Sequence, residues 1–250
     1  PNGRLAARVA RAHDRRMSSR PLARRFCLLA AVAALSGLPG QPFRAQSSGS
    51  SAGCEIALLL ADDISGSVDD GEYRLQVDGL ADALADPDVV AALLQGRAAL
   101  AVVQWSATGM QKLVMPWRQM NSAADIAAFA DEARIQPRAF GKAQTAVADA
   151  LAFSVNQFAS APDCRHRVID ISGDGVQNEG GSLSAAREAA IAARIEVNAI
   201  AIEGLGLAIT EFYRRMVITR NGFVVTAHGH VEYPRAIREK LVRELVVPTG

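Results

Sequence analysis

Aromatic residues are scarce in this chain, and their scarcity limits how a core can be built. Phenylalanine, tryptophan and tyrosine make up 5% of the 250 residues, whereas hydrophobic residues as a whole make up 50%. The core must therefore consist mainly of Ala, Val, Leu and Ile, a composition that favours helices packed on a parallel sheet. A chain of this length has room for one large domain or two small ones.

Long hydrophobic runs are also missing, because no apolar stretch reaches the roughly 20 residues that a transmembrane helix needs. The run Phe26–Leu35 follows Arg24-Arg25 and has about the length of a signal-peptide core. We interpret residues 1–45 as an upstream extension and signal peptide, with Met17 as an alternative start and the cleavage site left open. The alternative is an amphipathic or disordered tail. Export predicts a periplasmic or secreted protein with no membrane span in its mature form.

Acidic residues are nearly absent from the first 50 positions, which hold nine Arg and a single Asp. The remaining 200 residues carry 18 basic and 25 acidic side chains. A domain with this net negative charge is a poor partner for nucleic acid. Residues 46–53 are rich in Ser and Gly and predict a flexible linker, so residues 54–246 form the predicted folded domain.

Cysteine is rare as well, with three residues in the chain. Cys27 falls in the predicted signal segment. Cys54 and Cys164 remain as an even pair in a chain that is predicted to reach an oxidising compartment.

Short apolar runs alternate with segments of helical spacing along the rest of the chain. Strands are predicted at 55–62, 98–105, 111–117, 167–172, 196–202 and 222–227, and helices at 68–85, 89–94, 122–135, 145–158, 182–194, 210–217 and 233–245. The alternation predicts a three-layer, doubly wound α/β domain with a Rossmann-like, mostly parallel sheet. The short link 106–109 predicts a hairpin and hence one antiparallel edge strand.

Three loops carry oxygen ligands for a hard cation. Asp63-Ile64-Ser65-Gly66-Ser67 follows the first buried strand, and Ser172-Gly173-Asp174-Gly175 follows the strand that contains Val168–Ile171. Thr145 begins a predicted helix. Ligands in open α/β sheets bind beyond the carboxyl ends of the strands, and Mg²⁺ prefers oxygen ligands. The sequence therefore predicts a metal-assisted binding site.

These three motifs, in this order, resemble the metal-ion-dependent adhesion site of a von Willebrand factor A (vWA) domain. The phrases Val103–Ser106 and Val168–Gly175 also resemble an uncharacterised family of exported bacterial proteins with this domain. The resemblance covers residues 54–246 approximately. It implies the vWA fold and a non-catalytic, adhesion-type module that binds an acidic side chain, Asp or Glu, of a protein partner.

The resemblance also implies a role for each matching residue. Ser65 and Ser67 would bind the metal directly, Thr145 directly or through water, and Asp63 and Asp174 largely through water. Magnesium is the expected ion, with Mn²⁺ or Ca²⁺ as alternatives. The chain departs from the family at Lys142–Gln144, where small residues are usual, and this departure weakens the assignment of Thr145.

A disulfide between Cys54 and Cys164 is a further implication of the resemblance. The fold places the first and fourth strands side by side and parallel, and the two cysteines lie near the starts of these strands. The alternative is two free buried thiols.

Other interpretations of the same residues stay open at this stage. A metal-dependent hydrolase would use Asp63 or Ser65 as nucleophile. However, neither Ser65 nor Ser67 lies in a Gly-x-Ser-x-Gly elbow, and the three loops hold no histidine that could act as a base. A vWA scaffold with a decayed metal site is another alternative. We interpret His228 and His230 as surface residues. The basic residues of the last helix are interpreted as its solvated face; they are Arg235, Arg238, Lys240 and Arg243.

Overall fold

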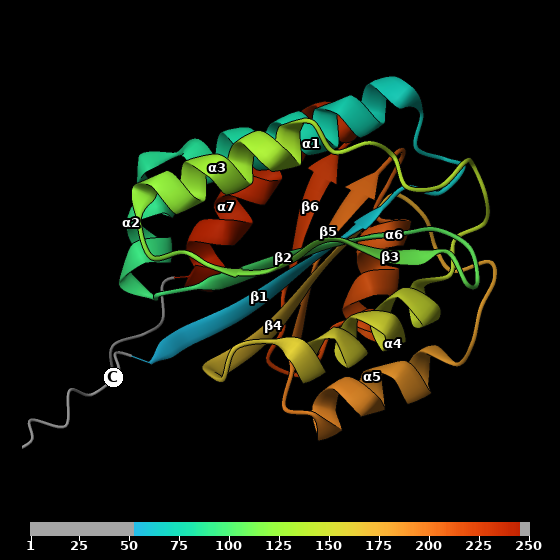
Figure 1. The fold of residues 1–250 in the computed structure, drawn as a ribbon. Helices are drawn as coiled ribbons and strands as arrows, with labels where there is room; N and C mark the ends of the chain where they lie inside the picture. Colours follow the sequence, from blue (N-terminus) through green and yellow to red (C-terminus); the bar gives the residue numbers. More distant parts are fainter. Residues whose placement is uncertain (1–52, 246–250) are drawn as a thin grey trace, which may run out of the picture. The chain divides into compact units, whose positions relative to one another are not determined.

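The computed structural model describes residues 53–245, so the predicted signal segment lies outside the described residues. Within them, six strands form one sheet in the order β3-β2-β1-β4-β5-β6 (Figure 1). The strands are β1 (Cys54–Asp63), β2 (Ala99–Trp105), β3 (Gln111–Gln119), β4 (Cys164–Gly173), β5 (Glu196–Glu203) and β6 (Val224–His228). Every pairing is parallel except that of β2 with β3. The predicted fold class and its antiparallel edge strand are confirmed.

Helices cover both faces of this sheet. The α-helices are α1 (Asp70–Ala85), α2 (Pro87–Gln95), α3 (Ala123–Arg134), α4 (Val147–Gln157), α5 (Leu183–Ala192), α6 (Ala208–Phe212) and α7 (Tyr233–Leu245). Three short helices, η1 (Phe158–Ser160), η2 (Tyr213–Val217) and η3 (His230–Glu232), extend or precede them. None of the helices in residues 53–245 is both long and apolar enough to cross a membrane.

The core has two halves, one on each face of the sheet. On one face, α1, α2, α3 and α7 pack on side chains such as Leu58 and Leu60; on the other, α4, α5 and η2 pack on the alternate side chains, such as Ala57 and Leu59 (Figure 1). Because β1 is buried on both faces, its sequence is a continuous apolar run rather than an alternating one. The scarcity of aromatic residues is thus met by a core of aliphatic side chains and alanine.

Local capping explains where the helices begin. The predicted helix 68–85 starts at Asp70, because the Asp69 side chain accepts a hydrogen bond from the Glu72 N–H and the Glu72 side chain accepts one from the Asp69 N–H. Ser122 caps α3 as the sequence predicts. The second predicted helix begins earlier than expected, since Pro87 occupies the first turn of α2 behind the cap Asp86.

The parallel register of β1 and β4 pairs Cys54 directly with Cys164. The two cysteines form a disulfide, with their Cα atoms 4.4 Å apart. The predicted bond is confirmed, and it lies at the end of the sheet opposite to the loops that follow β1 and β4.

One prediction about the last helix is wrong. Lys240 is completely buried rather than solvated, and its Nζ lies 2.5 Å from both Asp170 Oδ1 and Glu244 Oε1. The helical spacing predicts that Lys240 is exposed like the other basic residues of the helix. It is buried instead because it pairs with Asp170, an acidic residue inside β4. Burial raises the pKa of Glu244 to about 7, and it also raises the pKa of Asp170.

Candidate metal centre

The three oxygen-rich loops meet at the carboxyl ends of β1 and β4. Ser65 Oγ lies 3.1 Å from Ser67 Oγ and accepts a hydrogen bond from Thr145 Oγ1 at 3.2 Å. Ser67 Oγ donates to Asp174 Oδ1 at 2.6 Å, across a sequence separation of 107 residues. The structure thus brings the predicted hydroxyls and Asp174 into one connected cluster.

Asp63 forms the floor of this cluster and is completely buried. Its Oδ1 accepts a hydrogen bond from the Ser65 N–H at 2.7 Å, while its Oδ2 has no hydrogen-bond partner among the described residues. Burial, followed by the nearby charge of Asp174, raises the pKa of Asp63 to about 7. A buried carboxylate with an unpartnered oxygen is costly unless a cation or a proton compensates it.

Strand alternation separates the two neighbouring acids at the end of β1. Asp62 faces α7, where its Oδ1 accepts hydrogen bonds from Ser172 Oγ at 3.2 Å and from the Tyr233 hydroxyl at 3.4 Å. Burial raises the pKa of Asp62 to about 6. Only Asp63 belongs to the cluster, as the sequence predicts.

Tyr213 adds a group to the cluster that the sequence did not predict. Its hydroxyl is buried without a hydrogen-bond partner among residues 53–245, and burial together with the charges of Asp63 and Asp174 raises its pKa well above the usual value. A Cβ on Gly173 would overlap this hydroxyl and would lie 3.0 Å from Asp63 Oδ2. Glycine is therefore required here because the Tyr213 hydroxyl and the Asp63 carboxylate both reach the backbone of the third loop.

His230, interpreted as a surface residue, is buried beside the cluster. Its Nδ1 lies 3.1 Å from Glu72 Oε1, and its Nε2 lies 4.0 Å from Asp174 Oδ2. Nε2 also lacks a hydrogen-bond partner among the described residues. Three polar atoms near the cluster thus lack a hydrogen-bond partner among the described residues: Asp63 Oδ2, the Tyr213 hydroxyl and His230 Nε2. The first two lie beside Gly173, and the third lies near Asp174.

Arg138 holds the first loop in place from the segment after α3. Its Nη2 donates to the carbonyl oxygens of Ile64, Ser65 and Val68 at 2.8–2.9 Å. These carbonyls have few other partners in so tight a turn, and one guanidinium satisfies all three. No sequence motif pointed to Arg138, because its role depends on contacts with residues about 70 positions earlier.

The loop that carries Thr145 departs from the vWA pattern without displacing the threonine. Gln144 is exposed, so its bulk lies in solvent. The Thr145 N–H donates to Asn178 Oδ1 at 2.9 Å, and the Ala148 N–H donates to Gln177 Oε1 at 2.8 Å. Helix α4 starts at Val147 rather than at Thr145, so the Asn178 side chain holds the backbone just before the helix and the Gln177 side chain satisfies an N–H group of its first turn.

The donor set suits a hard divalent cation. It offers three hydroxyls and two carboxylates, and one carboxylate oxygen at its floor lacks a partner within residues 53–245. In that same part of the chain, no group of three or more His, Cys, Asp or Glu side chains is arranged to hold a metal. Any cation bound here would therefore be held mainly by hydroxyls.

Sequence comparison assigns the chain to a family. The sequence profile of a family described as "Protein of unknown function (DUF1194)" matches residues 53–249. The chain belongs to this family. No curated protein sequence matches the chain.

Solved structures similar to this DUF1194 member are vWA domains. Proximal thread matrix protein 1 from the mussel byssus aligns with a TM-score of 0.58 and 18% identity, over 76% of this chain and 47% of its own. A structure of that protein described as having a zinc-occupied MIDAS motif aligns with a TM-score of 0.57 and 22% identity, over 77% and 48%. The DUF1194 chain therefore spans less than half the length of this relative.

Two bacterial structures agree with that result. The von Willebrand factor type A structure from Catenulispora acidiphila has a TM-score of 0.55 and 17% identity, over 76% of this chain and 43% of its own. The pilus adhesin SpaC from Lactobacillus rhamnosus GG has a TM-score of 0.52 and 13% identity, over 76% and 30%. At these identities the likeness shows the fold alone, and the fold of this DUF1194 chain is that of a vWA domain.

Proposed function

We propose that this DUF1194 protein is an exported binding module that uses a divalent cation to engage an acidic side chain of a protein partner. The observation that carries the proposal is the cluster of Ser65, Ser67 and Thr145 hydroxyls with Asp63 and Asp174. Five residues from three distant stretches form one hydrogen-bonded cluster at the carboxyl end of the sheet. Such convergence is hard to explain by packing alone, since it buries a carboxylate oxygen without a partner among the described residues.

The chemistry of the cluster favours recognition of a carboxylate. Ser65, Ser67 and Thr145 are neutral donors, so they would leave most of the charge of a bound cation uncompensated. When bound, the cation supplies a coordination position that an external carboxylate can complete. Asp63 and Asp174 would orient the hydroxyls and water molecules around it. Magnesium fits this all-oxygen set best, and Mn²⁺ and Ca²⁺ are the alternatives to test.

The similar solved structures support a binding function, without specifying the metal or the partner. One of the similar proteins is a matrix protein, one is a pilus adhesin, and the mussel protein has been described with zinc in its MIDAS motif. The description of the pilus adhesin names an adhesive function. The proposal extends it to this chain, with export through the predicted segment 1–45 as part of the hypothesis.

The partner is tested by affinity capture from exported bacterial proteins, with the full chain as bait. We expect a partner that is retained in the presence of Mg²⁺ and released by a chelator. The Asp63→Ala bait should fail to retain it. The matched control is Asp62→Asn, which changes the neighbouring carboxylate on the opposite face of β1 and should leave capture intact.

A retained partner that ignores both the chelator and Asp63→Ala would contradict the proposal. The hydrolase alternative is tested separately with generic ester and phosphate substrates in the presence of Mg²⁺ and Mn²⁺. Turnover that is lost in Ser65→Ala would replace the binding function with an enzymatic one.

A further inference from the structure

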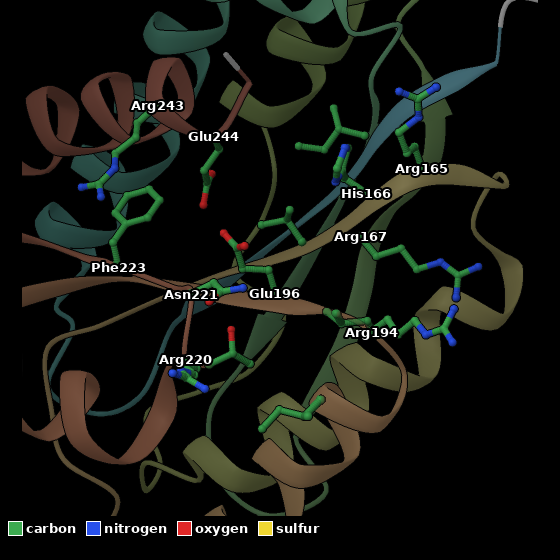
Figure 2. A pocket seen from close by; sticks show the side chains of 15 residues that line it. Arg165, His166, Arg167, Arg194, Glu196, Arg220, Asn221, Phe223, Arg243 and Glu244 are labelled. Carbon is green, nitrogen blue, oxygen red and sulfur yellow. The ribbon is translucent and has the colours of Figure 1, made fainter. Parts of the chain in front are cut away.

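A pocket of about 900 Å³ opens at the end of the sheet opposite to the metal centre (Figure 2). It lies where β4 and β5 begin, between the end of α5, the segment before β6 and the last turn of α7. Each residue of a strand advances the chain by about 3.3 Å, and β4 runs for 10 residues between the two sites. The pocket is therefore a separate site, roughly 25–30 Å from the metal centre.

Arginine dominates the lining of this pocket. Five arginines come from four separate segments, and we call the site the arginine pocket; they are Arg165, Arg167, Arg194, Arg220 and Arg243. Figure 2 shows their side chains around the pocket, with Glu196, Glu244 and Asn221 nearer its middle. Positions 51–250 hold 18 basic and 25 acidic residues. This concentration of positive charge therefore runs against the net charge of the domain.

Most of this positive charge lacks a compensating partner. Arg194, Arg220 and Arg243 form no ion pair with any acidic residue in the described range 53–245. Arg165 and Arg167 form only long contacts, at 3.5 Å to Glu55 and 3.8 Å to the fully exposed Asp163. Exposed pairs of this kind contribute little, so the arginines of the pocket repel one another unless an anion lies between them.

The two acids of the pocket are each engaged through one oxygen. Glu244 Oε1 accepts hydrogen bonds from Lys240 and from Asn198, which also donates to Glu196 Oε1. Glu244 Oε2 has no hydrogen-bond partner among residues 53–245. The lining combines five arginines with these two acids, so its net charge is positive.

A stacking contact holds one arginine, and another lies in an unusual backbone conformation. The Arg243 guanidinium lies 3.6 Å from the centroid of the Phe223 ring, a stacked arrangement that keeps its N–H edges available. Arg194 follows α5 with φ = 56°, a left-handed conformation that favours glycine at the end of a helix.

The register of the sheet brings Arg167 of β4 close to Arg194, which lies just before β5. Val168 pairs with Glu196, so Arg167 lies beside the residues that join Arg194 to β5. Figure 2 shows the Arg167 and Arg194 side chains extending in the same direction. A guanidinium binds a phosphate or a carboxylate through two parallel hydrogen bonds, and a phosphate dianion has enough oxygens and charge for two such groups at once.

We propose that the arginine pocket is a second binding site of this protein, which takes a phosphoryl group carried by a soluble phosphate compound or by a phospholipid headgroup. The site does not depend on the metal centre or on its function. The presence of several arginines in one pocket favours phosphate, which can accept hydrogen bonds from two guanidinium groups at once, over a single carboxylate.

The test uses the full chain in a chelator, so that the metal centre does not contribute. Calorimetric titration with pyrophosphate should show binding that citrate and chloride at the same ionic strength do not reproduce. Arg167→Gln and Arg194→Gly should each weaken pyrophosphate binding at least about tenfold, the expected effect of losing a charged hydrogen-bond pair. Arg74→Gln, which removes an arginine of α1 outside the pocket, should leave the affinity unchanged.

Arg194→Gly also separates a lost ligand from a lost fold. Glycine suits the left-handed conformation, so this variant should melt at or above the temperature of the wild type while binding more weakly. Sedimentation with vesicles of phosphatidylglycerol or of phosphatidylcholine distinguishes the two sources. Binding to the first alone, lost in Arg194→Gly, assigns the headgroup, and binding of pyrophosphate without vesicles assigns a soluble phosphate. Failure of both probes, tighter binding of citrate, or affinities that ignore both variants would overturn the proposal.

Discussion

Replacing Lys240 with methionine tests the buried charge cluster at the end of α7. The ammonium group is completely buried and lies 2.5 Å from a carboxylate oxygen of Asp170 and from one of Glu244. Glu244 also accepts a hydrogen bond from Asn198 at 2.8 Å. Lys240→Met removes the only cation in contact with these two acids in the described part of the chain, and it keeps a side chain of similar length.

The expected loss follows from the burial of the two acids. Breaking a buried ion pair by removing one partner costs about 3–5 kcal/mol, because a charge stays behind in the interior. We expect a loss of this size in the free energy of unfolding at pH 8. Burial already raises the pKa values of both acids, that of Glu244 to about 7. In the variant the two acids will take up protons more readily still.

The pH dependence therefore has a definite sign. A carboxyl whose folded pKa exceeds its unfolded value binds more protons in the folded state, so its contribution to stability falls as pH rises through that window. The defect of Lys240→Met should accordingly shrink from pH 8 to pH 5.5, by at least about 1.4 kcal/mol, the free energy of one pKa unit. Wild-type protein should change less, since its lysine compensates the acids.

Urea unfolding, followed by circular dichroism with the disulfide intact, measures both quantities. The matched control is Arg235→Met on the same helix, where an exposed arginine bridges Glu232 and Glu239. Such exposed pairs contribute about 0.2–1 kcal/mol, so the control should stay close to wild type. A Lys240→Met protein within about 1 kcal/mol of wild type at pH 8, or one equally destabilised at both pH values, would refute the reasoning.

Three further outcomes are expected. Replacing Cys54 and Cys164 with alanine opens a loop of 110 residues and should lower the free energy of unfolding by about 2–5 kcal/mol; equal urea midpoints in oxidised and reduced wild type would contradict this. Gly173→Ala should abolish the thermal shift caused by Mg²⁺ because its Cβ overlaps the Tyr213 hydroxyl, and adding Tyr213→Phe should restore part of it; no response to either change would count against the described contact. The pKa of Asp63 without metal is raised to about 7, so protons compete with the cation below that pH. Mg²⁺ affinity should therefore be weaker at pH 6 than at pH 8, and calorimetric affinities that do not change between these values would contradict the role of Asp63.

Much of the fold was predictable because the strands are buried on both faces. Continuous apolar runs such as Leu58–Leu60 mark the parallel strands, and the short link 106–109 marks the hairpin. The order of the three loops was readable for the same reason, since parallel strands bring their carboxyl ends to one edge. The cysteine pairing was predictable only from the resemblance to vWA domains, which specifies that β1 and β4 are neighbours.

Residues whose roles depend on distant partners were not predictable from local patterns. Tyr213 lies in η2, a wide helical turn within a segment that the sequence assigned to one short helix, and nothing nearby marks its hydroxyl as part of the site. His230 is buried by contact with Glu72, more than 150 positions earlier. For Lys240 a signal did exist, because Asp170 interrupts an apolar strand and a buried acid needs a partner.

Calorimetric titration of the metal-free full chain with Mg²⁺, in parallel for wild type, Asp63→Ala and Asp62→Asn, tests the metal centre most directly. The two variants alter adjacent carboxylates on opposite faces of β1. We predict saturable binding of one ion by wild type and by Asp62→Asn, and none by Asp63→Ala. Equal binding by all three proteins, or no binding of Mg²⁺, Mn²⁺ or Ca²⁺ by wild type, would contradict a cation site at Asp63, Ser65, Ser67, Thr145 and Asp174.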